Sequence, residues 1–262
     1  MRRGFNASFS GKVYIALVLV FLYAPIVVMA VMSFNSSPFY TLPVDWTFDW
    51  YVKLANNDKL VSAGFNSFAV AIATTLIATV IGTLAALAFF RYEFPGKAVL
   101  QVLLLPPIAI PWLIIGTSML IFFFWVGLGR GLHAMVLGHV ALALPYVIVV
   151  VTARLQGFDR QLEEAARSLG ANPWQVARRV TLPFLAPGII AAALFAFAVS
   201  FDQFVISYFL AVPGVSTLPV EIYTSIKKGF TPEINAISTI VIGLSMAMLL
   251  LVSRFYKFGG ER

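Results

Sequence analysis

The feature that most constrains this chain is a series of long apolar runs that contain no Asp, Glu, Lys or Arg. Six such runs divide the 262 residues: Val13–Met32, Leu60–Phe90, Ala98–Gly129, Gly131–Ala153, Val180–Phe201 and Ile234–Ser253. Each supplies the roughly 20 apolar residues that a helix needs to cross the hydrocarbon core of a bilayer. Only 11% of the residues are charged, against about 25% in soluble domains. The sequence therefore predicts an all-α integral membrane protein with six transmembrane helices.

We expect the whole chain, residues 1–262, to form a single transmembrane domain. The predicted spans cover residues 13–33, 64–90, 98–126, 131–153, 188–211 and 234–255. The third run is too short for two spans and a turn, since two spans need about 40 residues. Pro106, Pro107 and Pro111 interrupt it. Because proline lacks a backbone N–H donor, these prolines should split the third helix into two segments.

Arg2, Arg3 and Lys12 precede the first run, as basic residues precede the apolar region of a secretory signal. The run is longer than such a region, and no small-x-small cleavage site follows it cleanly. We interpret it as a retained first helix.

The basic residues are distributed unevenly between the two sides of the predicted membrane. The N-terminal tail, residues 91–97, residues 154–179 and the C-terminal tail hold 13 of the 18 Lys and Arg residues. The other side holds Lys53, Lys59, Arg130, Lys227 and Lys228. Because basic residues accumulate on the cytoplasmic side, both termini of this multi-pass protein are expected to be cytoplasmic.

Composition excludes several classes of function. No cysteine is present, which rules out disulfides, cysteine nucleophiles and Cys-ligated zinc, and His133 and His139 are too few for a histidine-based metal site. The net charge of +7 arises from basic residues between apolar runs, a pattern typical of anchoring to lipid headgroups and not of a nucleic-acid-binding face. We predict no catalytic residues, no metal and no nucleic acid partner.

On the outer side, Ser33–Asn66 is expected to form a long loop rich in proline and aromatic residues. Trp46 and Trp50 lie in it. Anchoring of these rings at the membrane interface is the favoured interpretation. Direct contact with substrate and docking of an external partner are the alternatives.

The most informative segment is the cytoplasmic loop of residues 154–187, between the fourth and fifth spans. Asp159 is expected to cap a short helix that Gly170 ends in the left-handed conformation. Asn172 should then cap a second helix, whose first position is a proline and which Pro183 ends. Such an elbow is either a solvated connector or a docking surface. The small side chains of Ala165 and Ala166, beside Glu163 and Glu164, favour docking.

This loop resembles a known motif. Glu164-Ala165-Ala166, then Gly170, then Val180-Thr181-Leu182-Pro183 is similar to the EAA motif of permeases of binding-protein-dependent ABC importers, with Val180 where isoleucine is frequent. Six spans with this loop between the fourth and fifth match the type I importer layout.

The resemblance implies that the loop helix seats in a cleft of a cytoplasmic ATPase. The residues implied in coupling to this ATPase are Glu163, Glu164, Ala165, Ala166, Gly170, Leu182 and Pro183. The chain has no G-x-x-x-x-G-K-[ST] run, so ATP and Mg²⁺ would be bound by the partner and no cofactor by this chain. The implied partners are a homologous permease subunit, two ATPase subunits and an external solute-binding protein. The implied location is the bacterial cytoplasmic (inner) membrane.

A narrower resemblance lies in the C-terminal part. Ser200–Phe209, Thr217–Tyr223 and Thr231–Ala236 are similar to the spermidine/putrescine permease branch, specifically its second, C-type subunit. Members often carry two acidic residues where this chain has Asp202-Gln203. The resemblance implies import of a polyamine or a similar small organic cation.

Asp202 is the only acidic residue in its span. A carboxylate in a membrane costs roughly 2.5 to 3.5 kcal/mol on insertion scales, so it should face a partner or a watery cavity. It lies about 21 Å along the helix from Gly188, in the outer half of the bilayer. We place it with Gln203 and Tyr208 in a substrate pathway; capping or pairing within the subunit is the alternative.

The sequence thus predicts a permease subunit of an ATP-driven importer that is not itself an enzyme. An ion-coupled secondary transporter of a small solute is the first alternative, and it would need a proton or sodium site but no ATPase. A membrane assembly factor that transports nothing is the second.

Overall fold

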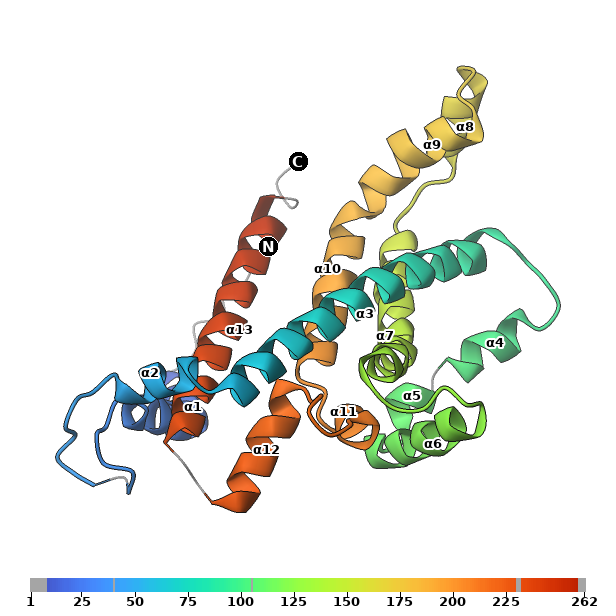
Figure 1. The fold of residues 1–262 in the computed structure, drawn as a ribbon. Coiled ribbons are helices and arrows are strands. Elements are labelled where there is room, and N and C mark those ends of the chain that lie inside the picture. Colours follow the sequence, from blue (N-terminus) through green and yellow to red (C-terminus); the bar gives the residue numbers. More distant parts are fainter. Residues whose placement is uncertain (1–8, 40, 105, 230–231, 259–262) are drawn as a thin grey trace. The chain divides into compact units, whose positions relative to one another are not determined.

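The structure is a computed structural model that describes residues 9–39, 41–104, 106–229 and 232–258 (Figure 1). Arg2, Arg3, Thr231 and the ends of both terminal tails lie outside the described residues. Within the described part every long element is helical, and the only β-pairs are two isolated bridges, Asn35 with Trp46 and Val212 with Val215. The expectation of an all-helical chain is confirmed.

The helices follow one another with short connections. In chain order they are α1 (Phe9–Met32), α2 (Asp49–Ala55), α3 (Asp58–Arg91), α4 (Lys97–Leu103), α5 (Pro106–Ala109), α6 (Trp112–Trp125), α7 (Leu132–Leu155), α8 (Gln161–Ser168), α9 (Pro173–Val176), the π-helix η1 (Ala177–Thr181), α10 (Leu182–Phe201), α11 (Val205–Leu210), α12 (Leu218–Lys228) and α13 (Glu233–Phe258).

Four of the described helical segments are long and apolar enough to cross a membrane: Gly11–Met32, Asp58–Arg91, Leu132–Leu155 and Pro173–Phe201. A fifth candidate is the pair Lys97–Ala109 and Trp112–Trp125, which bends by 110°. The bend falls at Pro111, the residue that caps α6, as expected where prolines remove backbone donors. The described part of the chain therefore shows four spans, or five if the bent pair is one.

The chain divides into two compact units, which are described separately. One comprises residues 1–61 and 224–250, and the other residues 62–223 and 251–262. The second unit contains the loop of residues 154–187 and every residue predicted to act in coupling or in the substrate pathway.

In the second unit α7 is the most buried helix. Its buried face includes Ala143, Val147 and Val151, which join an apolar core with residues of α3 and α10. Two glycines permit close helix approach: a Cβ atom at Gly82 of α3 would lie 2.6 Å from Val147, and one at Gly138 of α7 would lie 2.8 Å from Ile206. Real Cβ atoms do not come this close, so these contacts require glycine.

In the first unit, the predicted outer loop is shorter than expected. Residues 49–55 form α2, and α3 begins at Asp58, whereas the span was predicted from residue 64. Asn57 caps α3 by accepting a hydrogen bond from the Leu60 N–H at 3.3 Å. The helix therefore starts six residues before the predicted span, because a helix can continue beyond an apolar run once it has a cap, and its first turn tolerates charged residues.

The aromatic residues of this loop pack on one another. Phe34 stacks on Tyr51 with ring centroids 5.0 Å apart, and Trp50 Nε1 donates a hydrogen bond to the Asn35 carbonyl at 2.7 Å. Trp46 and Phe39 remain mostly exposed, as rings that anchor at an interface do.

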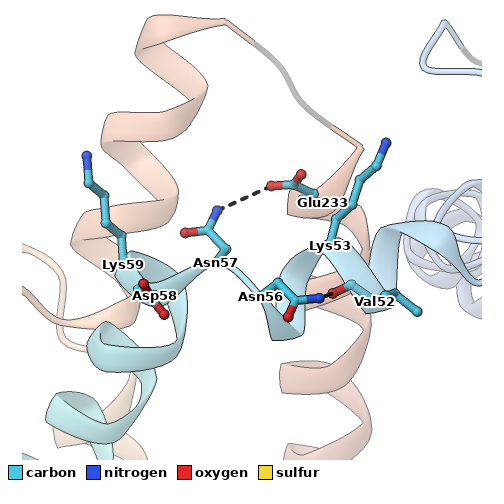
Figure 2. A pocket seen from close by; sticks show the side chains of 7 residues that line it. All are labelled: Val52, Lys53, Asn56, Asn57, Asp58, Lys59 and Glu233. Carbon is cyan, nitrogen blue, oxygen red and sulfur yellow. Dashed lines mark hydrogen bonds between the residues drawn. The ribbon is translucent and has the colours of Figure 1, made fainter.

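Beside this cluster a cavity of about 540 Å³ opens at the ends of α2, α3 and α13 (Figure 2). It is lined by Val52, Lys53, Asn56, Asn57, Asp58, Lys59 and Glu233. Asn57 Nδ2 donates to Glu233 Oε2 at 3.3 Å, and Lys53 Nζ lies 4.3 Å from the Trp50 ring centroid. The cavity is open and mixed in charge, which gives it no preference for a cationic or an anionic ligand.

Candidate functional site: the loop of residues 154–187 and the break after α10

The first half of the loop of residues 154–187 follows the expected local pattern. Asp159 Oδ1 accepts a hydrogen bond from the Gln161 N–H at 2.9 Å, at the start of α8. α8 ends at Ser168, and Gly170 follows with φ of +87°. The left-handed conformation expected at Gly170 is therefore confirmed.

The second half begins as expected and ends differently. Asn172 Oδ1 accepts from the Gln175 N–H and Gln175 Oε1 accepts from the Asn172 N–H, both at 2.9 Å, which is a complete capping box. The prediction that Pro183 ends this helix was wrong. The chain passes through η1 directly into α10, with Pro183 in its first turn. The wider π-turn before Pro183 adapts the hydrogen-bond pattern to its missing N–H.

The loop presents an exposed surface with apolar side chains. Glu164 and Ala165 are exposed, Ala166 is half-buried, and Leu182 and Pro183 are exposed. Leu162, Leu169 and Trp174 are 50%, 90% and 69% exposed. Leu169 and Trp174 were not among the predicted residues. Large apolar side chains left in water on a charged loop are typical of a protein interface.

Glu163 points away from this surface and into the subunit. Its Oε1 atom accepts from Arg91 Nη2 at 2.5 Å and from Thr181 Oγ1 at 2.5 Å. Both Glu163 and Thr181 are buried. The carboxylate therefore joins the end of α3 to α8 and to η1 of the loop. Arg91 and Thr181 were missed as partners because they lie 72 and 18 residues from Glu163, beyond the spacing of contacts within one helix.

A second contact joins the two ends of the loop. The Arg154 side chain lies on Gly188, where an added Cβ atom would come within 2.9 Å of Arg154 Cβ. Arg154 Nε donates to the Phe184 carbonyl at 3.0 Å, and the guanidinium lies 4.2 Å from the Phe184 ring centroid. On the other side, Arg160 stacks on Phe90 and donates to its carbonyl. These contacts hold the loop rigidly on α3, α7 and α10.

The second group of predicted residues lies where α10 ends. The predicted fifth span, 188–211, is not one helix: α10 ends at Phe201, Asp202 is its C-cap, and α11 starts at Val205. Asp202 is exposed and Gln203 is 1% exposed. Gln203 Oε1 accepts from the Val205 N–H at 3.1 Å, while its Nε2 is buried with no hydrogen-bond partner in the described structure. Apolar composition alone did not reveal this break.

Aromatic rings surround the break. Phe204 lies 4.7 Å from Tyr223 and 5.4 Å from Tyr208, measured between ring centroids, and Tyr208 is 45% exposed. Two contacts from α3 hold the segment that leads to Tyr223: Ser67 Oγ accepts from the Leu218 N–H at 2.7 Å, and Asn66 Nδ2 donates to the Ser216 carbonyl at 3.0 Å. Phe204 lies between Asp202 and Tyr208 in the sequence, whereas Tyr223 joins the rings of Phe204 and Tyr208 only through the fold.

Among the described residues, no group of three or more His, Asp or Glu side chains has a geometry suited to a metal ion. The chemistry available at the break is an exposed carboxylate, an amide and aromatic faces.

Relatives with known names match nearly the whole chain. It is 35% identical over 243 residues to the spermidine/putrescine transport system permease protein PotC of Haemophilus influenzae, which covers 93% of this chain and 95% of the relative. It is 37% identical over 231 residues to the putrescine transport system permease protein PotI of Escherichia coli K12, covering 85% and 82%.

The fold is shared with a solved importer. A chain in the crystal structure of a bacterial alginate ABC transporter, in complex with an alginate pentasaccharide-bound periplasmic protein, superposes with a TM-score of 0.72 at 18% identity, over 95% of this chain and 92% of that one. Residues 78–258 match the family described as binding-protein-dependent transport system inner membrane component. This protein therefore belongs to that family and is a permease subunit of an ABC importer, in which a separate chain hydrolyses ATP.

Proposed function

We propose that this permease imports a polyamine, or a similar small organic cation, and that Asp202 and the aromatic rings at the break contact the cation. The observation that carries the proposal is the exposed carboxylate of Asp202 at the break between α10 and α11, two residues before Phe204, whose ring packs with those of Tyr208 and Tyr223. The substrates in the names of the PotC and PotI relatives support the same class of cargo.

The chemistry of this group suits an ammonium ion on an aliphatic chain. A carboxylate pairs with the charge, and aromatic faces attract an ammonium group while also packing against methylene groups. Gln203 adds one acceptor close to the carboxylate, but this acceptor already bonds the backbone. Asp202 is therefore the main source of charge selectivity in the proposal.

The proposal also includes the membrane topology of the chain and its partners. We place both termini in the cytoplasm, six spans in the membrane, and the chain beside a homologous permease subunit, two ATPase subunits and an external solute-binding protein. The exposed surface of α8 and α9, with Glu164, Leu169 and Trp174, is the part of the chain that docks on the ATPase in this proposal. Glu163 supports that surface from inside through Arg91 and does not contact the ATPase.

Asp202→Asn tests the substrate contact, because the amide keeps the shape of the side chain and removes its charge. A hydrogen bond to a charged group contributes about 1.5 to 3 kcal/mol. We therefore expect the half-saturating concentration of radiolabelled spermidine to rise about tenfold or more in the assembled importer, at an unchanged level of complex. Asp45→Asn, which neutralises an exposed carboxylate of the other unit, is the control and should transport normally. Unchanged uptake kinetics in Asp202→Asn would remove this residue from the pathway.

A further inference from the structure

His139 is a buried polar side chain that neither the coupling loop nor the proposed cation contact uses. It lies on α7 with 1% of its surface exposed. Its Nδ1 atom is 2.8 Å from Ser200 Oγ, and its Nε2 atom is 3.0 Å from Ser207 Oγ. Both serines are buried as well. One imidazole therefore bridges two hydroxyl groups in an apolar part of the molecule.

The two serines lie on opposite sides of the helix break. Ser200 is in the last turn of α10 and Ser207 is in α11, with Asp202, Gln203 and Phe204 between them. A helix that is interrupted loses the backbone hydrogen bonds that would fix the direction of the next helical segment. The imidazole supplies an external connection between the two pieces, from a third helix.

Histidine suits this position because of the hydrogen-bonding roles of its two ring nitrogens. A neutral imidazole donates from one ring nitrogen and accepts at the other, and each serine hydroxyl can do either. The three groups therefore form a complete chain in either tautomer, with no ring nitrogen unpaired. An apolar side chain of similar volume would leave both hydroxyl groups without this partner, at a cost typical of buried polar groups.

The surrounding packing adds a second constraint on α11. Gly138 precedes His139, and an added Cβ atom there would lie 2.8 Å from Ile206 and 3.3 Å from Leu210. Ile206 and Leu210 are fully buried. α11 thus packs against α7 at Gly138 and is hydrogen-bonded to α7 at His139, and it also packs against α6, where an added Cβ atom at Gly116 would lie 2.8 Å from Phe209.

We infer that His139 is a positioning residue for the substrate pathway: by bonding Ser200 and Ser207 together across the break, it sets the angle between α10 and α11 and so the places of Asp202 and Tyr208. The consequence is a role in substrate affinity without any contact to the substrate. The role in substrate affinity rests on the proposed function for the identity of the transported cation. The role in setting the angle between α10 and α11 does not.

The first test measures geometry directly. Because the chain contains no cysteine, spin labels can be attached at Ile190→Cys in α10 and Tyr208→Cys in α11, both exposed positions. The distance distribution between the labels in the assembled importer should be narrow with His139 present and should broaden or shift in His139→Leu. An identical distribution in both backgrounds would overturn the inference, whatever the substrate proves to be.

The second test measures transport of radiolabelled spermidine by the assembled importer. Ser200→Ala and Ser207→Ala each remove one hydroxyl with little change in volume. They therefore test the inference even if the His139→Leu subunit does not assemble into the importer. All three variants should raise the half-saturating concentration several-fold and leave the maximal rate within about twofold. Because each breaks the same chain of bonds, the Ser200→Ala and Ser207→Ala effects should be less than additive when combined.

Ser245→Ala is the matched control, since within the described residues that hydroxyl bonds the Val241 carbonyl of its own helix; it should behave as wild type. Variants that lower only the maximal rate, in proportion to the amount of complex, would reduce His139 to a packing role and contradict the inference. A wild-type importer that takes up no spermidine would count against the proposed substrate, and the label distances would then decide the role of His139.

Discussion

At the scale of single residues, two adjacent carboxylates of the EAA-like stretch have different roles. Both Glu163 and Glu164 were expected on the docking surface, yet Glu163 is buried against Arg91 and Thr181 while Glu164 is exposed. Adjacent positions on a helix point about 100° apart, so two neighbouring side chains can lie in different surroundings. The motif located the helix, but only the packing of α3 against the loop shows which carboxylate faces outward.

Gly170 provides the sharpest residue-level prediction. It has φ of +87°, and a Cβ atom there would contact nothing within 4 Å. Gly170→Val is therefore expected to act through backbone strain alone, at a cost of about 1 to 3 kcal/mol, and to displace α8 from α9. Substrate-stimulated ATPase activity of the assembled importer should fall at least several-fold while the subunit remains in the membrane.

Gly64→Val is the matched control for this substitution. Gly64 is equally open, but it lies within α3 with no positive φ. Its replacement should leave ATPase stimulation close to wild type. Equal activity in Gly170→Val and Gly64→Val would show that the left-handed turn has no part in coupling.

At the scale of elements, the apolar runs predicted most of the long helices and missed the break after α10. The runs that became α1, α3 and α7 are continuous in the structure, and the prolines of the third run mark its bend, as predicted. The break after α10 could not be predicted from its own residues, because the side chain that bonds on both sides of it is His139, on a helix distant in sequence. The predicted helix end at Pro183 was wrong for a related reason. The π-turn that lets the helix continue there has no simple sequence pattern.

The docking surface of α8 and α9 has its own test. Glu164→Lys reverses a charge on the exposed face, and Leu169→Glu places a charge where 90% of the side chain is already exposed. Neither should perturb the isolated subunit, because neither side chain is buried. We expect both to reduce co-purification of the ATPase subunits by about tenfold, as substitutions at the centre of an interface do.

Glu93→Lys is the comparison for these two variants. Glu93 is an exposed carboxylate outside the loop that pairs with Lys97 at 2.7 Å, and such surface pairs contribute little. It should retain the ATPase. If Glu164→Lys and Leu169→Glu retain it equally well, the loop is a connector and the partner docks elsewhere.

At the scale of the whole molecule, the topology remains a prediction. The charge distribution places the tails and the 154–187 loop on the cytoplasmic side. A reporter enzyme fused after Arg262, or inserted between Arg160 and Arg179, should report a cytoplasmic location, and one inserted near Asp49 an external one. An internal location for the Asp49 reporter would contradict the six-span topology.

The central claim is that this chain conducts a small organic cation across the membrane only when a separate ATPase drives it. The most direct measurement is uptake of radiolabelled spermidine or putrescine into proteoliposomes that contain this subunit, its partner permease and the ATPase subunits, with the binding protein on the outside and ATP within. The account predicts uptake that requires ATP and the binding protein, that vanadate stops, and that persists without an ion gradient. Uptake driven by a proton or sodium gradient in the absence of the ATPase would contradict it.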